Sequence, residues 1–215
     1  HKGSDDLSAA GLTTSTSRSH QRMVQMLRHV TPCQDRLCLK TVSGLMGEDA
    51  IREAGMTSQV VWSASVPSSA ADTREAGRRL EAAGVDLLVF AGGDGTARNV
   101  CEAAPGMPVL GLPAGVKMHS GVFAVNPQSA AELLLKLLDA RGVSIEAAEV
   151  RDLDEDALRQ GQVRPRFFGE LRTPFDPRLV QQMKCGTPDS DALVQAEIAA
   201  GVVEAMEDGV VYLLC

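Results

Sequence analysis

Hydrophobic residues form two kinds of pattern along the chain, a helical spacing and continuous apolar runs. Met23, Leu27 and Val30 are spaced three to four positions apart, which is typical of a helix, and Pro32 ends the pattern. The run from Val85 to Ala91 is continuously apolar, as expected for a strand that is covered on both faces. Together these patterns predict strands at 37–42, 59–62, 85–91 and 109–112, and helices at 23–30, 48–54, 69–83, 97–104 and 129–141.

Start and stop signals support several of these helices. Ser69 and Asp72 form a capping-box pattern, and Gly84 stops the same helix. Ser129 with Glu132 repeats the capping-box pattern before the apolar run at 133–138. Because strands alternate with helices at this spacing, the sequence predicts an α/β fold: a doubly wound, mostly parallel sheet with helices on both faces.

The pattern changes beyond about residue 144. Charged and aromatic residues mix between 150 and 175, and Pro165, Pro174 and Pro177 interrupt any long helix. Apolar spacing then predicts a helix at 194–206 and a strand at 210–214. We therefore predict an α/β domain at 1–144 and part of a second domain at 145–215. Since the chain opens on polar residues and ends on an apolar strand, we expect it to lack segments at both ends.

A glycine-rich turn follows the apolar strand at 85–91 and reads Gly92-Gly93-Asp94-Gly95-Thr96. In an open α/β sheet such a turn lies at the carboxyl edge of the strands, where ligands bind. The three glycines allow the backbone to approach a phosphate and to adopt positive φ, and Thr96 can cap the helix or donate its hydroxyl to a phosphate. Asp94 would repel a phosphate unless it holds a cation or accepts a proton. The alternative is that Asp94 only makes the turn and caps the helix.

Common nucleotide fingerprints do not describe this turn. The chain has no GK[ST] P-loop, and a GxGxxG pattern starting at Gly93 fails because Arg98 stands in place of the last glycine. Lys117, His119 and Ser120 follow the next strand, so they are expected at the same sheet edge. Lys117 is a candidate counter-charge for phosphate or else a solvated lysine, and His119 is a candidate contact or else a structural histidine.

Charge and composition exclude several classes of function. The chain has 21 basic and 28 acidic residues, a net charge of −7, and its basic residues are scattered, which predicts neither a nucleic-acid surface nor an anionic-membrane surface. The apolar stretches are too short to span a bilayer, and no secretory signal opens the chain. The five cysteines form no CxxC pair, so we expect reduced thiols, a cytoplasmic protein and no metal site made by protein ligands.

The GGDGT turn after an apolar strand resembles the signature shared by NAD kinases, diacylglycerol kinases and sphingosine kinases, which have a phosphofructokinase-like N-terminal domain. Three further segments, 47–50, 90–98 and 112–123, resemble the ATP-NAD kinase subgroup that includes acetoin catabolism protein X. The resemblance covers nearly the whole chain. It implies a nucleotide-binding domain at 1–144 and, at 145–215, part of a mainly β domain that binds the substrate NAD.

The resemblance also implies a chemistry and a set of site residues. A kinase of this family transfers phosphate from ATP or polyphosphate to the 2′-hydroxyl of NAD with Mg²⁺, which makes NADP. The aspartate that matches Asp94 acts as the base, and the residues implied to cradle phosphate are Gly92, Gly93, Gly95 and Thr96. The Asn-Glu motif that holds the nicotinamide nucleoside in ordinary NAD kinases is not evident, and Asn99 is the loose candidate for that contact. Relatives in the superfamily commonly self-associate, so a homo-oligomer is expected.

Two other functions fit the same residues. The first is a non-catalytic NAD(H)-binding or nucleotide-binding regulatory protein of acetoin catabolism, which the missing Asn-Glu motif suggests. The second is a lipid kinase of the diacylglycerol type, which shares the GGDGT turn. NAD phosphorylation is the main prediction, because the acidic residue within a phosphate-binding turn needs a chemical role.

Overall fold

A computed structural model describes residues 17–115, 118–153 and 165–181 of the chain. Contacts divide the chain into two compact units, residues 1–183 and 184–215, and all described residues belong to the first. The helix predicted at 194–206 and the strand predicted at 210–214 lie outside the described residues. The domain boundary at residue 144 stays a prediction.

The first unit alternates helices with strands, so the predicted α/β class is confirmed. The helices are α2 (Arg18–Val30), α3 (Glu48–Glu53), α4 (Ala70–Ala82), α5 (Asp94–Ala103) and α6 (Pro127–Leu138), with 3₁₀ turns η2 (Thr31–Arg36) and η3 (Gly44–Met46). The strands are β1 (Lys40–Val42), β2 (Gln59–Trp62), β3 (Leu88–Gly92), β4 (Val109–Pro113), β5 (Ser144–Leu153) and β6 (Pro165–Phe175).

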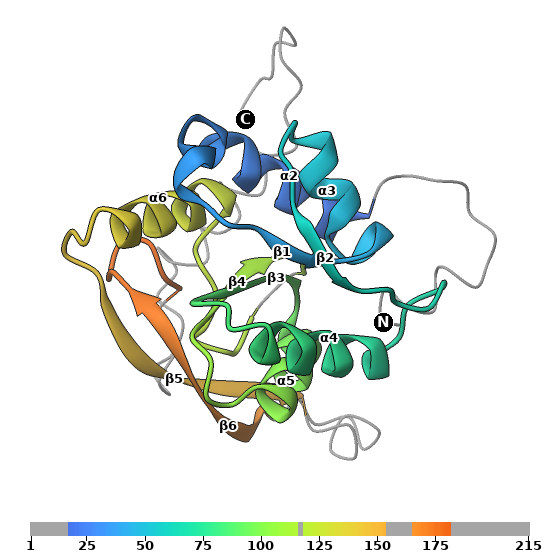
Figure 1. Ribbon diagram of the computed structural model, residues 1–215. Helices are drawn as coiled ribbons and strands as arrows, with labels where there is room; N and C mark the ends of the chain where they lie inside the picture. The colour runs from blue at the N-terminus through green and yellow to red at the C-terminus, as the bar shows by residue number, and fades with distance from the viewer. Residues whose placement is uncertain (1–16, 116–117, 154–164, 182–215) are drawn as a thin grey trace, which may run out of the picture. The chain divides into compact units, whose positions relative to one another are not determined.

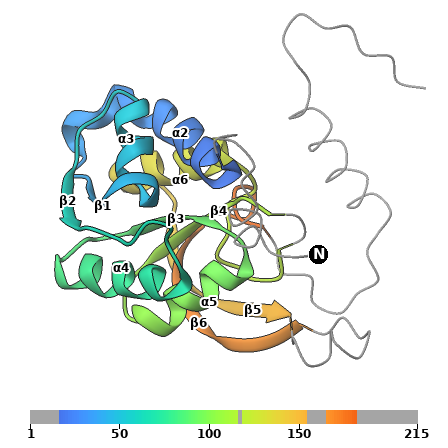
Figure 2. The same ribbon diagram turned by 90° about the vertical axis from the view of Figure 1, so that its right-hand side faces the viewer.

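The described strands form three pairs rather than one continuous sheet. β1 pairs with β2 and β3 with β4, both in parallel, whereas β5 and β6 are antiparallel. Figure 1 shows α2, α3 and α6 on one side of β3 and β4, with α4 and α5 on the other. Figure 2, turned by 90°, shows the same layers. Helices therefore cover both faces of the central parallel pair.

The side chains of β3 alternate between two hydrophobic cores, as the pleat of a strand requires. Leu88 and Phe90 belong to the core that contains the apolar residues of α4 and α5. Val89 and Ala91 pack against the core formed by α2, α3 and α6. The continuously apolar sequence of β3 is thus explained by burial on both faces. Because β3 is packed on both faces, its end, where the glycine turn begins, is held in place between the two cores.

The start of α4 follows the sequence prediction, but the start of α6 does not. Ser69 and Asp72 form the predicted capping box, with the Ser69 amide donating to Asp72 Oδ2 at 2.8 Å. The predicted start of α6 at Ser129 is wrong, because the helix begins at Pro127 and Asn126 is its cap. The Asn126 side chain accepts a hydrogen bond from the Ser129 amide at 2.8 Å, and a proline is well suited to a first helical position.

The antiparallel pair β5–β6 packs against α5 and β4, and these four elements share one core. Val150 of β5 and Leu171 of β6 are buried in the same cluster as Ala97 and Val100 of α5. Pro165 is the first residue of β6 and Pro174 lies next to its end, positions where a strand tolerates proline. The β5–β6 pair therefore contacts α5, the helix that begins at the glycine turn.

An acidic group joins α6 to the end of β6. Lys136 Nζ lies 2.7 Å from Asp176 Oδ2, and the Arg178 amide donates to Asp176 Oδ1 at 3.0 Å. The hydrogen bond from Lys136, followed by those from Arg178, holds the pKa of Asp176 well below its ordinary value. A carboxylate whose pKa is lowered by folding contributes stability above its unfolded-state pKa, and this contribution is lost as the pH falls below about 4.

We therefore expect Asp176→Asn to lower Tm at pH 7 and to flatten the fall of the unfolding free energy between about pH 4 and pH 2. Chemical denaturation at a series of pH values measures both effects. Asp139→Asn is the matched control, because the Asp139–Arg36 ion pair is more exposed and should contribute less. Equal slopes for the wild type and Asp176→Asn in this pH range would contradict the assignment.

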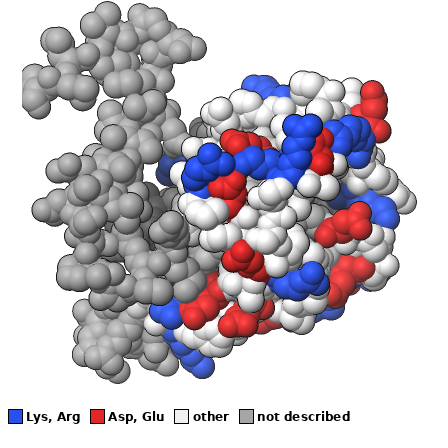
Figure 3. Space-filling model, turned by 90° about the vertical axis from the view of Figure 1, so that its left-hand side faces the viewer, with Lys and Arg blue, Asp and Glu red and all other residues white. Residues whose placement is uncertain are grey.

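In the ranges that the structure describes, none of the helices is long and apolar enough to cross a bilayer. Figure 3 shows Lys and Arg side chains interspersed with Asp and Glu on the face that it draws. On that face no large field of one sign is present, so an anionic ligand needs a local arrangement of donors.

Candidate functional site

The turn from β3 into α5 lies at the carboxyl edge of the central strand pair. Gly92 is the last residue of β3, Gly93 is the helix cap with φ −118° and ψ −168°, and Asp94 is the first residue of α5. Gly92 is in register with Pro113 of β4, and the Ala114 amide donates to the Gly92 carbonyl at 2.9 Å. The two strands therefore end together, and the loop after β4 begins beside the glycine turn.

The Asp94 carboxylate is bonded to the loop that follows β4. The His119 amide donates to Oδ2 at 2.8 Å, while the Ser120 amide and hydroxyl lie 3.0 and 2.7 Å from Oδ1. A carboxylate has about four acceptor positions, so these contacts leave one on Oδ2. Asp94 is only partly buried. The structure thus brings Asp94, His119 and Ser120 together, as the order of the strands predicts.

Ser120 extends this network into β5. Its side chain is buried, and its Oγ lies 2.8 Å from the Arg151 carbonyl and accepts from the Arg151 amide at 3.0 Å. The next residue, Gly121, donates its amide to the Glu149 carbonyl at 2.9 Å. The acidic group at the start of α5 is therefore connected through one hydroxyl to the backbone of the hairpin. In this structure Ser120 orients Asp94, in addition to any contact that it makes with a ligand.

The three glycines of the turn differ in what an added side chain would meet at each position. None of them has a positive φ, so the expected left-handed backbone is not what requires glycine here. A Cβ on Gly92 would lie 2.7 Å from Thr96 Cβ, because the Thr96 side chain folds back over Gly92. A Cβ on Gly93 or Gly95 would meet no atom closer than 3.9 or 3.8 Å. Packing therefore explains Gly92, whereas Gly93 and Gly95 leave open space at the start of α5.

The backbone amides at the start of α5 suit an anion. Hydrogen bonds from the Thr96 and Ala97 amides, 3.0 and 3.1 Å long, are made to the Gly93 carbonyl. The amides of Asp94 and Gly95 precede these bonds, and such groups have no acceptor within their own helix. Together with the positive end of the helix dipole they favour a negatively charged ligand.

Arg98, Asp152 and Phe168 adjoin the turn, although sequence reasoning did not select them. Arg98 Nη1 lies 2.9 Å from Asp152 Oδ2, and the Arg98 guanidinium lies 5.2 Å from the centre of the Phe168 ring. The Arg166 guanidinium also lies over this ring, with Arg166 Cζ 5.4 Å from the centre of the Phe168 ring. The signal for Arg98 is its spacing, since it follows Asp94 by one helical turn. Nothing local in the sequence points to Asp152 or Phe168.

Two other candidates lie apart from the turn or outside the described residues. Asn99 is buried between α4 and α5, where its Oδ1 accepts from Arg74 Nη1 at 2.7 Å. It follows Asp94 by five residues, which places it about 140° around the helix. The structure therefore does not bring Asn99 together with Asp94. Lys117 lies outside the described residues.

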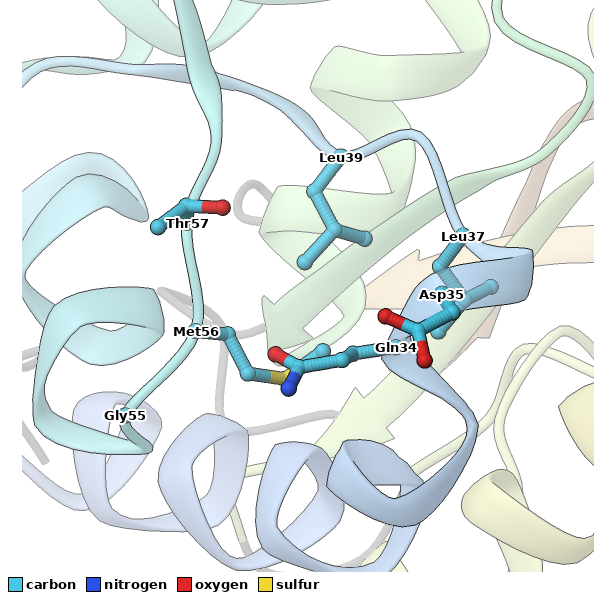
Figure 4. Close-up of a pocket in the computed structure, with 7 residues that line it drawn as sticks. All are labelled: Gln34, Asp35, Leu37, Leu39, Gly55, Met56 and Thr57. Carbon is cyan, nitrogen blue, oxygen red and sulfur yellow. The ribbon is translucent and has the colours of Figure 1, made fainter.

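A pocket of about 420 Å³ lies at the amino-terminal end of the parallel strands β1 and β2 (Figure 4). Leu39 immediately precedes β1 and Thr57 precedes β2, so the pocket is at the amino edge of this pair. Its lining consists of Gln34, Asp35, Leu37, Leu39, Gly55, Met56 and Thr57. Ligands of open α/β sheets bind at the carboxyl edge, so this pocket is not the phosphate site.

In the parts of the chain that the structure describes, no group of three or more His, Cys, Asp or Glu side chains is arranged to hold a metal ion. Cys33, Cys38 and Cys101 are free thiols. Burial, followed by the nearby Glu102 charge, raises the pKa of Cys101, so this thiol is held protonated.

Comparison with known proteins identifies the family. The model of the ATP-NAD kinase N-terminal domain matches residues 13–142, which is more than half of the 215-residue chain. The matched range contains the β3–α5 turn with Asp94 and the loop that bears Ser120. Comparisons with curated proteins and with solved structures give no match. The chain belongs to the ATP-NAD kinase family.

Proposed function

We propose that the protein transfers a phosphoryl group from ATP or polyphosphate to the 2′-hydroxyl of NAD, which makes NADP. Membership of the ATP-NAD kinase family supports a phosphotransferase that uses a nicotinamide nucleotide. Within the family, segment 112–123 supports the subgroup that includes acetoin catabolism protein X. In this proposal the protein is cytoplasmic and homo-oligomeric, and its substrates are nucleotides rather than nucleic acids or membranes.

The observation that carries the proposal is the position of Asp94. Its carboxylate stands at the first residue of α5, between two glycines whose missing side chains leave space. The loop amides of His119 and Ser120 orient it, and Oδ2 retains an acceptor position. An acidic group held in this way beside an anion-binding helix start is suited to accept a proton from a hydroxyl.

The proposed step follows from this arrangement. Asp94 accepts the proton of the NAD 2′-hydroxyl, and the hydroxyl oxygen forms a bond to the terminal phosphorus of the donor. The bond between that phosphorus and its bridging oxygen breaks, and the shortened donor leaves with the bridging electron pair. The amides at the start of α5, with Gly93, Gly95 and the Thr96 hydroxyl, bind the phosphate oxygens and limit their movement. Lys117 and His119 would supply further positive or polar contacts from the neighbouring loop, and Asn99 would contact the nucleoside only after a rearrangement.

Mg²⁺ fits this site as part of the bound nucleotide. Asp94 already accepts bonds from His119 and Ser120, and the described residues hold no cluster of carboxylates for a bare cation. Mg²⁺ keeps several waters and is commonly bound through substrate phosphates with one or two carboxylates. When bound, it would neutralise charge on the phosphates, and Asp94 is the side chain of the turn that could contact its waters.

The direct test is formation of NADP. The purified full-length protein is incubated with NAD, Mg²⁺ and either ATP or polyphosphate, and NADP is quantified by a coupled dehydrogenase assay. We expect NADP with at least one donor and no phosphorylation of diacylglycerol or a sphingoid base. Absence of NADP with both donors, under conditions in which a reference NAD kinase is active, would exclude the proposal. Phosphorylation of a lipid alone would instead favour the lipid kinase.

One observation favours a second candidate, a regulatory protein that binds NAD(H) without turnover. Asp94 already makes three hydrogen bonds that join the glycine turn to the next loop, so its charge also has a structural role. A regulatory protein of this kind predicts NAD(H) binding that survives Asp94→Asn, without turnover. Calorimetric binding in the absence of any NADP formation would support this candidate.

A further inference from the structure

The Arg98 guanidinium lies beside the start of α5, although the Arg98 backbone is one turn further along the helix. Its Nη1 is 2.9 Å from Asp152 Oδ2, and a Cβ on Gly95 would lie 3.8 Å from that same oxygen. Helical side chains lean towards the N-terminal end of their helix, which accounts for this placement. The Arg98–Asp152 ion pair therefore borders the space that Gly95 leaves open.

The cation is held in place from two directions. Asp152 contacts one end of the guanidinium, and the Phe168 ring lies against it with 5.2 Å between Arg98 Cζ and the ring centre. The Arg98 side chain is 27% exposed and that of Asp152 is 19% exposed. Arginine has five N–H donors in a planar fork, and the contact with Asp152 engages Nη1. The guanidinium is thus both oriented and partly accessible.

We propose that Arg98 binds the polyphosphate chain of the phosphate donor, and that Asp152 occupies the Arg98 guanidinium when no donor is bound. Carboxylate and phosphate present similar oxygen pairs to a guanidinium, so one can replace the other. The chain carries a net charge of −7, so attraction of a polyphosphate has to come from local groups, and this cation adds to the amides at the start of α5. This inference rests on the proposed phosphotransferase function, because it assigns the donor to the same turn.

The two residues then have opposite effects on donor binding. Removal of Arg98 removes an attraction, whereas removal of the Asp152 charge frees the guanidinium and removes a repulsion. A purely structural ion pair, which would only fasten α5 to β5, predicts that both changes weaken binding or that neither matters. The sign of the Asp152 effect therefore separates the two interpretations.

Calorimetric titration of the full-length chain tests the proposal, with sodium tripolyphosphate in one arm and ATP in the other, at fixed ionic strength and without NAD. We expect Arg98→Gln to raise Kd by about 10-fold or more and Arg98→Lys to have a smaller effect, since lysine keeps the charge but not the fork. Asp152→Asn should lower Kd by about 3- to 10-fold. In the double variant Arg98→Gln/Asp152→Asn this gain should shrink. A response to ATP but not to tripolyphosphate identifies a nucleotide donor, and the reverse identifies an inorganic one.

Arg36→Gln is the matched control, because Arg36 makes a comparable ion pair with Asp139 at 2.8 Å away from the turn. Its Kd should equal that of the wild type. The proposal is overturned if the wild type binds neither probe, if Arg98→Gln binds as the wild type does, or if Asp152→Asn weakens binding. Circular dichroism checks the fold of each variant, and if Arg98→Gln does not fold, Arg98→Lys and Asp152→Asn decide.

This titration does not depend on turnover, so its outcome can be separated from that of the proposed function. Arg98-dependent binding of tripolyphosphate or ATP without any NADP formation would remove the kinase proposal and keep the phosphate contact. NADP formation with donor binding that does not depend on Arg98 would keep the kinase proposal and remove the phosphate contact of Arg98.

Discussion

Asp94→Asn is expected to lower kcat for NADP formation by about 10²- to 10⁴-fold, the usual contribution of a general base. The substituted amide cannot accept a proton at neutral pH. It also presents an N–H group where the His119 or Ser120 amide donates to the carboxylate, so one donor loses its acceptor. We therefore expect a loss of about 1–3 kcal/mol in the free energy of unfolding as well. Steady-state kinetics and chemical denaturation measure the two effects separately.

Two further variants separate chemistry from positioning. Asp86→Asn changes an exposed aspartate near the amino end of the same strand, and it should leave both kcat and stability unchanged. Ser120→Ala keeps the Asp94 charge and both loop amides but removes the hydroxyl that lies 2.7 Å from Oδ1. We expect it to lower kcat by about 10-fold or less, because the two loop amides still orient Asp94, and to lower stability because the Arg151 amide also loses its acceptor. If Asp94→Asn retained the kcat of the wild type, Asp94 would be a structural clamp and not the base.

Local signals explain why much of the helical structure could be predicted. The Ser69–Asp72 capping box acts within four residues, and it starts α4 as the sequence indicates. Gly55 and Gly84, predicted to stop helices, have φ of 77° and 69°, values that favour glycine at a helix end. Each of these features depends on neighbours in the sequence, so no knowledge of the fold is needed to find it.

The prediction for α6 fails because two local signals compete. Ser129 and Glu132 form a capping-box pattern, but Asn126 followed by Pro127 forms an equally local start signal three residues earlier. Proline at the first helical position has its φ already fixed for a helix and needs no amide bond there. The earlier signal therefore wins, and the Ser129 amide becomes the donor to the cap.

The contacts of the site depend on distant parts of the chain, and this limits what the sequence can predict. The carboxyl edge of β3 and β4 brings Asp94 to Ser120, and the order of parallel strands makes that meeting predictable. The ion pair of Arg98 with Asp152 spans 54 positions and depends on how the β5–β6 pair packs against α5. The prolines of this region indicate only that a long helix is interrupted, so nothing local in the sequence predicts that packing.

In the glycine turn, packing accounts for one glycine, and the proposed phosphate site would account for another. Gly92→Ala places a Cβ 2.7 Å from Thr96 Cβ, so we expect a loss of about 1–3 kcal/mol in the free energy of unfolding from overpacking. Gly95 has space for a Cβ and lies in the first turn of α5. Alanine favours a helix over glycine by about 1 kcal/mol at an interior position and by less near the end. The sequence keeps glycine there at a small cost in stability.

Gly95→Ala is therefore expected to raise Tm slightly and to weaken donor binding, because its methyl group would occupy the space that a phosphate oxygen needs. If that group displaces one or two charge-assisted hydrogen bonds, Kd for ATP or tripolyphosphate rises by about 10- to 100-fold. Gly106→Ala is the control, since Gly106 is exposed, precedes the amino end of β4 and has its nearest side-chain atom 3.6 Å from the added Cβ. Thermal melts and titration of the two variants compare stability with binding. A Gly95→Ala protein that binds both donors as tightly as the wild type would show that the open space at the start of α5 holds no phosphate.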